Sequence, residues 1–394
     1  MTYRKFQSDS LFNGTTFLGP DKVLITDDAG IVIDILSSSE AGDDILKFHQ
    51  TISPGFINAH CHLELSHMKG RVLPGTGLVD FLITVILQRG AAIEEIQEAM
   101  ALAERQMFET GTSGVGDICN TAYSIGIKKE SRIGWRNFIE VLGFTEINAS
   151  KRLEDGQKTL DVFLEAGNSV GKSSLSPHAP YSVSPELFRL INAVSFGRLI
   201  SIHNQESMAE QDLFTRGKGE MFKLYERLNI DPSFFSAPGI SSLQSYLPTL
   251  DKASAIILVH NTYTSEQDID FALSRSGIND IFFCLCPRAN QYIESATPPA
   301  EMIRSKGGSI IVGTDSLASN YSLDLLEEIK LLHQEFPGIP VAELLQWATS
   351  NGAKALEMDD TLGSFTPGKQ PGIILLDGVN EDNILANAKA TRLM

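Results

Sequence analysis

Two histidines separated by one residue, His60 and His62, end an apolar run of the sequence. Alternate side chains of a β-strand point to the same face, so both imidazoles share one face and Cys61 takes the other. Two neutral imidazoles held this way can chelate a divalent ion such as zinc or iron. Taken alone, a His-x-His pair is better explained by two surface or hydrogen-bonded histidines, so residues later in the chain must decide between this explanation and a metal site.

Polar residues also follow other apolar runs that we interpret as strands. They are His178 and Tyr181 after the fourth run, His203 and Glu206 after the fifth, His260 after the sixth, Arg288 and Asn290 after the seventh, and Asp315 after the eighth. Five of the eight histidines lie at such positions, counting His60 and His62. Core packing does not explain this concentration, because buried histidine and aspartate each need polar partners.

Three imidazoles and one carboxylate can bind a divalent cation and leave a position for water. His60, His62, His203 and Asp315 are the predicted ligands of one ion, zinc or alternatively iron. Such an ion lowers the pKa of water towards neutrality, and Asp315 is the predicted base that accepts the proton.

Two further residues are predicted to be catalytic. Glu206 lies three residues after His203, and if burial raises its pKa it can donate a proton to a ring nitrogen. His260 is predicted to stabilise the negative charge of an addition intermediate. The alternatives are a solvated residue at a helix start for Glu206 and a histidine without a direct role for His260.

The elements that must position these residues follow a strand–loop–helix pattern. Predicted strands are Thr51–Ala59, Ser113–Ile118, Arg136–Gly143, Ser174–Pro177, Leu199–Ile202, Ala255–Val259, Ile281–Cys286 and Ser309–Gly313, and predicted helices include Ala92–Glu109, Pro185–Val194, Glu266–Leu273, Pro299–Lys306 and Leu323–Phe336. This count predicts an α/β fold, a (β/α)8 TIM barrel with reactive groups at the carboxyl ends of its strands. An open doubly wound sheet would need a glycine-rich phosphate loop after an early strand, and Gly111–Gly116 lies before and within its strand instead.

Both ends of the chain are rich in short strands and turns. Residues 1–50 contain the apolar runs Val23–Thr26 and Gly30–Leu36, and the turn-rich segment 363–372 leads into Ile373–Leu376. Neither end can build a core alone, so we expect them to form one small β-sandwich. The predicted organisation is 1–50 and 361–394 for the sandwich and 51–360 for the hydrolase barrel.

Composition limits the classes of partner. The chain has 42% hydrophobic and 21% charged residues, and 32 basic against 49 acidic residues give a net charge of −17. This charge opposes binding to nucleic acid and to anionic membranes. No signal peptide or membrane span is expected, which predicts a cytoplasmic location. The four scattered cysteines are expected to be buried free thiols.

The positions of these residues resemble the amidohydrolase superfamily over essentially the whole chain. The resemblance rests on His60-Cys-His62, His203, His260 and Thr314-Asp315 at successive strand ends. The His203-x-x-Glu206 spacing is similar to the mononuclear deaminase branch, which contains chlorohydrolases, guanine deaminases and methylthioadenosine deaminase-like enzymes. Other motifs resemble the aminodeoxyfutalosine deaminases of menaquinone biosynthesis: Ala59–Ser66, His178–Ser182, Val259–Asn261, Cys286–Asn290 and Gly313–Asn320.

This resemblance implies a barrel, a composite β-sandwich, one metal ion and the release of ammonia from an aminated purine-type ring. Binuclear members of the superfamily need a bridging group, commonly a carboxylated lysine at the end of strand four. Here Lys172 precedes that strand and His178 follows it, which disfavours a second metal.

The predicted partner is a small aminated heterocycle or nucleoside, and a homodimer is left open. Predicted substrate-binding residues are Glu64, Arg71, His178, Tyr181, Arg288, Asn290, Ser319 and Asn320. Glu64 is expected to accept hydrogen bonds from ribose hydroxyls, and Arg71 or Arg288 to pair with a substrate carboxylate. His178 either orients the substrate or fixes its own loop.

Three other functions compete with deamination of aminodeoxyfutalosine. The first is deamination of methylthioadenosine, S-adenosylhomocysteine or another nucleobase compound. The second is hydrolysis of a cyclic amide or a C–Cl bond on the same barrel, against which Glu206 argues because protonation of a ring nitrogen suits an aromatic amine. The third is a non-catalytic scaffold, which would have lost at least one metal ligand, and none is lost.

Overall fold

Two four-stranded parallel sheets form the centre of the computed structural model, which describes residues 3–275 and 279–394. The first sheet contains β6 (Phe56–Cys61), β7 (Thr112–Cys119), β8 (Gly134–Val141) and β9 (Lys172–Pro177) in this order. The second contains β10 (Leu199–Asn204), β11 (Ala255–His260), β12 (Asp280–Leu285) and β13 (Ser309–Val312). The predicted α/β class is confirmed, and each predicted strand overlaps one of these eight.

The two parallel sheets meet at both pairs of edges. Between β6 and β13, the Thr314 and Asp315 N–H groups both donate to the His60 carbonyl at 3.0 Å, and Cys61 and Asp315 form a parallel bridge. Between β9 and β10, the His203 N–H donates to the His178 carbonyl at 3.0 Å. This arrangement is consistent with the predicted (β/α)8 barrel.

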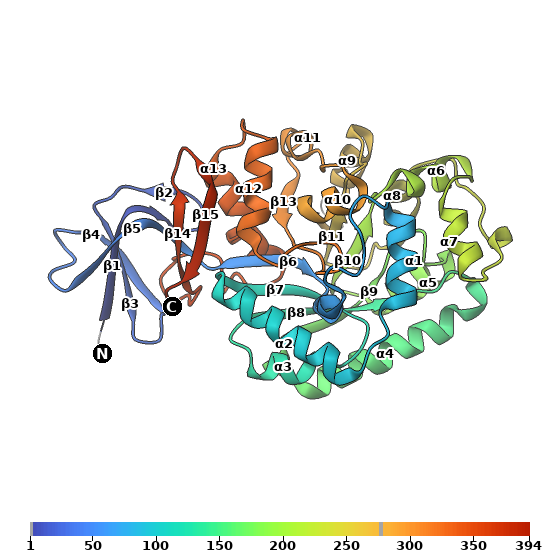
Figure 1. Cartoon of the computed structure of the whole chain (residues 1–394), viewed down its shortest axis with the longest axis horizontal. Coiled ribbons are helices and arrows are strands. Elements are labelled where there is room, and N and C mark those ends of the chain that lie inside the picture. Colours follow the sequence, from blue (N-terminus) through green and yellow to red (C-terminus); the bar gives the residue numbers. More distant parts are fainter. Residues whose placement is uncertain (1–2, 276–278) are drawn as a thin grey trace.

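The helices surround these sheets in Figure 1 and follow the strands in sequence. They are α1 (Leu78–Gln88), α2 (Ile93–Glu109), α3 (Ile125–Glu130), α4 (Ala149–Ala166), α5 (Pro185–Val194), α6 (Met208–Arg216), α7 (Met221–Arg227), α8 (Ser242–Tyr246), α9 (Glu266–Leu273), α10 (Pro287–Glu294), α11 (Ala300–Ser305), α12 (Leu325–Glu335), α13 (Val341–Trp347) and α14 (Ser350–Ala355). Local sequence explains several helix starts: Ser184 accepts a hydrogen bond from the Leu187 N–H before Pro185, and Ser265 forms a capping box with Asp268.

Strands from both ends of the chain share a third sheet, at the left of Figure 1. Its order is β15 (Ile384–Arg392), β14 (Ile373–Val379), β5 (Ile45–Pro54), β1 (Tyr3–Phe12), β3 (Lys22–Asp27) and β4 (Val32–Ser37), with β2 (Phe17–Leu18) paired to β1. The antiparallel pairing of β14 with β5 joins the two ends, and Phe6, Ile52 and Ile373 are buried in its core. Strand pairing thus joins both termini in one sheet; the sandwich arrangement and the domain boundaries stay predictions.

The predicted strand Thr51–Ala59 is divided between two sheets, which corrects its boundaries. Residues up to Pro54 belong to β5 of the terminal sheet, whereas β6 starts at Phe56. Gly55 lies at the division, where its N–H donates to the Pro371 carbonyl at 3.2 Å and an added Cβ would be 1.9 Å from Ser113 Oγ. Only glycine permits the backbone to approach Ser113 this closely. Gly55 therefore allows the chain to pass from the terminal sheet into the parallel sheet at this point.

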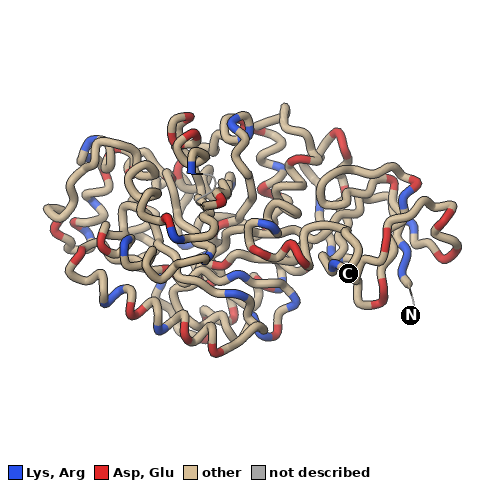
Figure 2. The backbone as a smooth tube through the Cα atoms, turned by 180° about the vertical axis from the view of Figure 1, so that it is seen from behind, with Lys and Arg blue, Asp and Glu red and all other residues tan. Residues whose placement is uncertain are grey.

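Charged residues of both signs are interspersed along the backbone in Figure 2. All four cysteines are buried and free, as predicted. Over the described residues, no helix is long and apolar enough to span a bilayer.

Candidate active site

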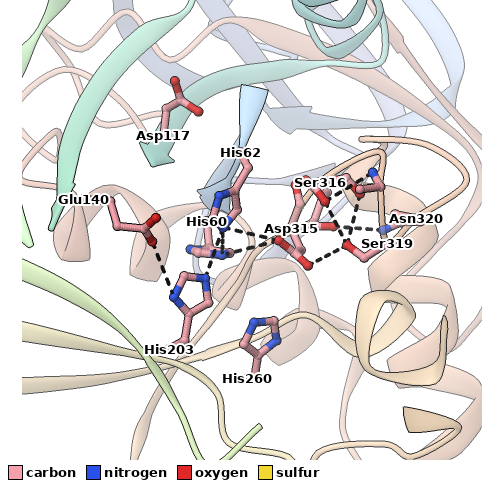
Figure 3. Close-up of polar contacts among 12 residues, drawn as sticks. His60, His62, Asp117, Glu140, His203, His260, Asp315, Ser316, Ser319 and Asn320 are labelled. Atoms are coloured by element: carbon pink, nitrogen blue, oxygen red, sulfur yellow. Dashed lines mark hydrogen bonds and ion pairs between the residues drawn. The ribbon is translucent and has the colours of Figure 1, made fainter. Parts of the chain in front are cut away.

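Three of the predicted metal ligands converge at the carboxyl ends of β6 and β10. The Nε2 atom of His62 lies 3.2 Å from Nε2 of His60 and 3.1 Å from Nε2 of His203. Figure 3 shows the three rings directed towards one point. His60 lies in β6 and His62 directly follows its last residue, and the two rings point to the same side, as the alternation of strand side chains predicts; His203 comes from β10 of the other parallel sheet.

The protonation of these rings suits a metal ion. Burial, followed by the repulsion of neighbouring imidazoles, lowers the pKa of His62 and lowers that of His203 further. The Nδ1–H of His203 donates to the His178 carbonyl at 2.8 Å, which leaves the lone pair of Nε2 directed at the other two rings. Nδ1 of His60 is buried without a partner. Three imidazole nitrogens this close together fit a divalent cation.

Asp315 completes this group from the loop after β13. Its Oδ1 lies 3.6 Å from His60 Nε2 and 3.5 Å from His62 Nε2, and the Ser319 hydroxyl donates to its Oδ2. Burial opposes its ionisation, but the hydrogen-bonding contact with His60 and the electrostatic interactions with the neighbouring His62 and His260 rings outweigh burial and lower the pKa of Asp315. The carboxylate is therefore ionised, which suits both a metal ligand and a proton acceptor.

Glu206 and His260 lie next to each other beside this cluster. His260 Nε2 is 3.5 Å from Glu206 Oε1, and both side chains are buried. Burial, with the negative charges of Asp315 and Glu210, raises the pKa of Glu206 well above its usual range, so this carboxyl can carry a proton at neutral pH. Burial lowers the pKa of His260 to about 3, which keeps its ring neutral.

Left-handed backbone conformations orient these loops. The φ angles of Gln205, His260 and Asp315 are 47°, 75° and 57°, which non-glycine residues rarely adopt. The Glu210 carboxylate stabilises the turn after β10 by accepting the Gln205 N–H at 3.0 Å and the Glu206 N–H at 3.2 Å. Strain paired with specific hydrogen bonds is typical of functional sites.

A cavity of about 230 Å³ opens onto the cluster, and its walls are mostly apolar. Polar lining residues include His62, His203, Glu206, His260 and Asp315 on one side, and the apolar wall is formed by Leu65, Leu78, Phe81, Leu82, Val85, Ile86, Leu142, Phe144, Leu224 and Leu228. Arg89 at the end of α1 also lines the cavity. Such a cavity suits a ligand with a polar reacting end and an apolar body.

The predicted substrate residues fall into three groups. His178 and Tyr181 line the cavity, and His178 Nδ1 is hydrogen-bonded to the Ser182 hydroxyl. Asn290 contacts His260 Nδ1 at 3.2 Å, Ser319 contacts Asp315, and Asn320 donates to the Thr314 carbonyl at 2.9 Å. These last three residues position the cluster and do not line the cavity.

Glu64, Arg71 and Arg288 are not among the residues that line the cavity. The Glu64 carboxylate accepts hydrogen bonds from the Thr121 N–H and hydroxyl at 3.0 and 2.9 Å. Arg71 pairs with Glu95 at 2.6 Å, and Arg288 pairs with Glu327 at 3.2 Å. The expected contacts of these three with ribose or a carboxylate therefore find no support in the structure, because their polar groups are engaged elsewhere.

Sequence reasoning missed three features of the site. The first is Arg89, which belongs to no motif. Only its position directly after the amphipathic α1 could have suggested that it lines the cavity. Glu140 lies near the carboxyl end of β8 and its Oε1 is 3.8 Å from His203 Nδ1; the strand-end rule applied to β8 would have found it. Asp117 on β7 accepts the Leu63 N–H at 2.9 Å and pairs with the buried Lys128, which fixes the turn after His62.

Comparisons with known proteins agree with this geometry. Residues 51–392 match the model of the amidohydrolase family. The adenosine deaminase of Helicobacter pylori is 28% identical over 87% of this chain and 86% of its own length. The aminodeoxyfutalosine deaminase of a Nitratiruptor species is 28% identical over 82% of this chain and 78% of its own.

A solved structure is also similar to this chain. The crystal structure of Helicobacter pylori aminofutalosine deaminase in complex with methylthio-coformycin superposes with a TM-score of 0.82 and 25% identity, covering 96% of this chain and 93% of that one. The predicted superfamily is thus confirmed by a family match that covers most of the sequence. The chain belongs to the amidohydrolase family, whose members are metal-dependent hydrolases.

Proposed function

We propose that this protein is a hydrolytic deaminase that releases ammonia from an aminated purine-type ring, with aminodeoxyfutalosine as its substrate. The observation that carries the proposal is the pair of Glu206 and His260, 3.5 Å apart and buried beside three converging imidazoles. Hydrolysis of a carbon–nitrogen bond agrees with the family. Relatives and a solved structure that are named as adenosine and aminofutalosine deaminases support the substrate class.

We further infer that the eight parallel strands close into one (β/α)8 barrel and that the terminal sheet folds into a small β-sandwich. The hydrogen bonds at both seams of the parallel sheets support closure. A barrel places all eight strand ends at one rim, where the cavity lies.

The proposed cofactor is one zinc ion per chain, with iron as the alternative. His60, His62, His203 and Asp315 would hold it, since three imidazoles and one carboxylate suit either metal. Bound there, a divalent ion acts as a Lewis acid and makes water a better nucleophile near neutral pH.

The residues of the chain supply the proton transfers. Asp315 accepts a proton from water as the oxygen adds to the amino-bearing ring carbon. Glu206 delivers its proton to the neighbouring ring nitrogen, and the neutral His260 lies where it can donate a hydrogen bond to the developing negative charge. The proton held by Asp315 then passes to the amino group, the C–N bond breaks and ammonia leaves, and the hydroxyl proton of the intermediate returns to Glu206 as the ring carbonyl forms.

Ammonia release from a set of aminated compounds tests this function. Aminodeoxyfutalosine, methylthioadenosine and adenosine are assayed side by side by the loss of aminopurine absorbance. We expect aminodeoxyfutalosine to exceed the other two in kcat/KM by at least about 10², because a site built to pair with a carboxylate discriminates strongly against ligands that lack it. Equal turnover of adenosine or methylthioadenosine would overturn the substrate, and the absence of ammonia release from all three would overturn the deaminase.

Arg89 is the residue that we expect to pair with the carboxylate of the substrate. Arg89→Gln should lower kcat/KM for aminodeoxyfutalosine by about tenfold or more, because one charge-assisted hydrogen-bonded pair is lost, and should leave methylthioadenosine nearly unaffected. Arg71→Gln is the matched control, since Arg71 pairs with Glu95 outside the cavity. Equal effects of both variants on aminodeoxyfutalosine would remove Arg89 from substrate binding.

Metal content tests the number of ions. Protein purified without added metal should contain about one zinc or iron per chain, because the three imidazoles and Asp315 form one cluster. His203→Ala should lose most of it, whereas His333→Ala, which changes a histidine bonded to Asn383 far along the chain, should retain it. A reproducible content near two, with activity that follows the second ion, is the result that contradicts a mononuclear site.

A further inference from the structure

A second, larger groove lies at the opposite ends of the strands from the active site. It has a volume of about 900 Å³ and is lined by the first residues of β7, β8 and β9 and by the terminal segments around residues 29–31, 368–372 and 392–394. Arg136 lines it, while Glu140, four residues later on the same face of β8, lines the active-site cavity. At about 3.3 Å per residue these positions are roughly 13 Å apart, so the two sites are separate.

The charge of this groove is opposite to that of the chain. Four basic side chains line it, namely Arg132, Arg136, Lys172 and Arg392, whereas Glu357 is the one acidic side chain among the described lining residues. The chain as a whole has a net charge of −17. A local concentration of cations on an acidic protein focuses a positive potential that attracts anions.

Arg136 is the strongest evidence that the groove receives a ligand. Its side chain is 3% exposed, yet its Nε is buried without a partner. Glu357 Oε2 is 3.7 Å from Arg136 Nη2 and 3.5 Å from Lys172 Nζ, both longer than a charge-assisted hydrogen bond. The one side-chain hydrogen bond of Arg136 among the described residues runs from Nη2 to the Ser174 hydroxyl at 3.4 Å. A buried guanidinium needs fuller hydrogen-bonded compensation than this long bond and Glu357 supply.

Aromatic side chains add a second unpaired donor and an apolar wall. Trp135 also lines the groove. It precedes Arg136 on β8, so its buried side chain points to the other face of the strand, and its indole N–H has no partner among the described residues. The guanidinium groups of Arg132 and Arg392 lie 3.9 and 4.2 Å from the centre of the Phe108 ring, which holds two cations close together. Apolar lining residues continue this wall: Ile31, Ile133, Leu356, Met358 and Leu362.

Arg392 differs from the other basic residues of the groove because its hydrogen bonds are made within the protein. Arg392 donates to the backbone carbonyls of Phe108, Thr112 and Met394, so its donors are already engaged. Arg132, Arg136 and Lys172 therefore supply the free donors, and together with Arg392 they set four positive charges against one loosely paired carboxylate. This excess of positive over negative charge in the groove is better neutralised by a dianion than by a single carboxylate.

We propose that this groove binds a small organic phosphate, whose phosphate contacts Arg136, Lys172 and Arg132 and whose apolar body lies against the Phe108–Leu362 wall. The phosphate accepts hydrogen bonds from the guanidinium and ammonium groups, and its double charge offsets the local surplus. The volume of the groove accommodates a body as large as an aromatic ring or a nucleoside. This site is independent of the proposed deaminase activity.

Isothermal titration of the full chain tests the proposal with three probes. Phenyl phosphate carries both features, inorganic phosphate only the charge and phenol only the apolar ring. We expect phenyl phosphate to bind at one site per chain, inorganic phosphate to bind several-fold more weakly and phenol not to bind. Equal affinity for the two phosphates would overturn the apolar part of the site, and no heat from phenyl phosphate at millimolar concentration would overturn the site itself.

Variants locate the binding. Arg132→Gln combined with Lys172→Gln changes two residues that are not buried, so folding should be preserved, and affinity for phenyl phosphate should fall by at least about tenfold because two charged hydrogen bonds are lost. The matched control is Lys151→Gln with Lys158→Gln on α4, whose lysines pair with Asp155 and Glu154 at the surface. Equal weakening by the control would show that only the overall charge matters.

Two further variants distinguish the groove from the active site. Arg89→Gln should leave the affinity for phenyl phosphate unchanged, and a loss in that variant would place the anion in the active-site cavity and overturn the proposal. Binding should also change the fluorescence of Trp135, and Trp135→Phe should remove this change. A change that persists in Trp135→Phe would come from Trp347, which is buried elsewhere, and would contradict binding in the groove.

Discussion

Replacing Glu206 by glutamine should lower kcat by about 10² to 10⁴, the usual contribution of a positioned general acid, while the metal content stays unchanged. Glutamine keeps the size and the hydrogen bonding of the side chain but carries no transferable proton. Burial raises the pKa of Glu206, so the native carboxyl carries that proton at neutral pH. The measurement is steady-state ammonia release together with zinc and iron analysis of the same preparation.

Glu64→Gln is the matched control for Glu206→Gln. Glu64 is also a buried carboxyl near the end of β6, and burial raises its pKa to about 7, but it accepts hydrogen bonds from Thr121 and does not line the cavity. We expect Glu64→Gln to change kcat only a few-fold. Glu206→Asp should recover part of the activity, since the acid is retained but displaced by one methylene. Near-normal turnover in Glu206→Gln would exclude this residue from proton transfer.

The metal cluster was predictable because the sequence rules that carry it are local. His60 and His62 share a face through strand alternation alone, and His203 and Asp315 follow apolar runs of the length of buried strands. Parallel strands then bring these ends to one rim. The same reasoning located each of the eight parallel strands, and it failed at Gly55, where only the close contact with Ser113 and Pro371 reveals the change of sheet.

The residues of the substrate cavity were less predictable because long loops and helix ends determine which side chains face it. The sequence favoured Arg71 and Arg288 and offered no motif for Arg89, yet glutamates engage the first two and Arg89 lines the cavity. Which acidic residue a surface arginine pairs with depends on how distant segments of the chain pack together. The hydrophobic periodicity of the sequence does not contain this information. Buried polar contacts are equally hard to predict from the sequence. Lys128 belongs to the charged run Lys128-Lys129-Glu130, which is typical of an exposed segment, yet its side chain is buried.

Lys128→Met should lower the free energy of unfolding by about 3 to 5 kcal/mol, the usual cost of leaving one partner of a buried ion pair uncompensated. Lys128 Nζ contacts Asp117 Oδ2 at 2.5 Å and Asn137 Oδ1 at 2.7 Å, and both side chains of the ion pair are fully buried. Burial alone lowers the pKa of Lys128, but Asp117 and Cys119 outweigh burial and raise it, so the ammonium stays charged. The free energy is measured by urea unfolding of metal-saturated protein, followed by circular dichroism.

Two comparisons separate this ion pair from general effects of the substitution. Lys151→Met removes the exposed pair of Lys151 with Asp155 and should change the free energy of unfolding by less than about 0.5 kcal/mol. Asp117→Asn combined with Lys128→Met should recover part of the loss, because no buried charge is left unpaired. Since Asp117 also accepts the Leu63 N–H directly after His62, Lys128→Met should weaken metal binding too. A loss below about 1 kcal/mol with unchanged metal affinity would mean that the hydrogen bonds of Asp117 to Leu63 and its other neighbours compensate its buried charge without Lys128.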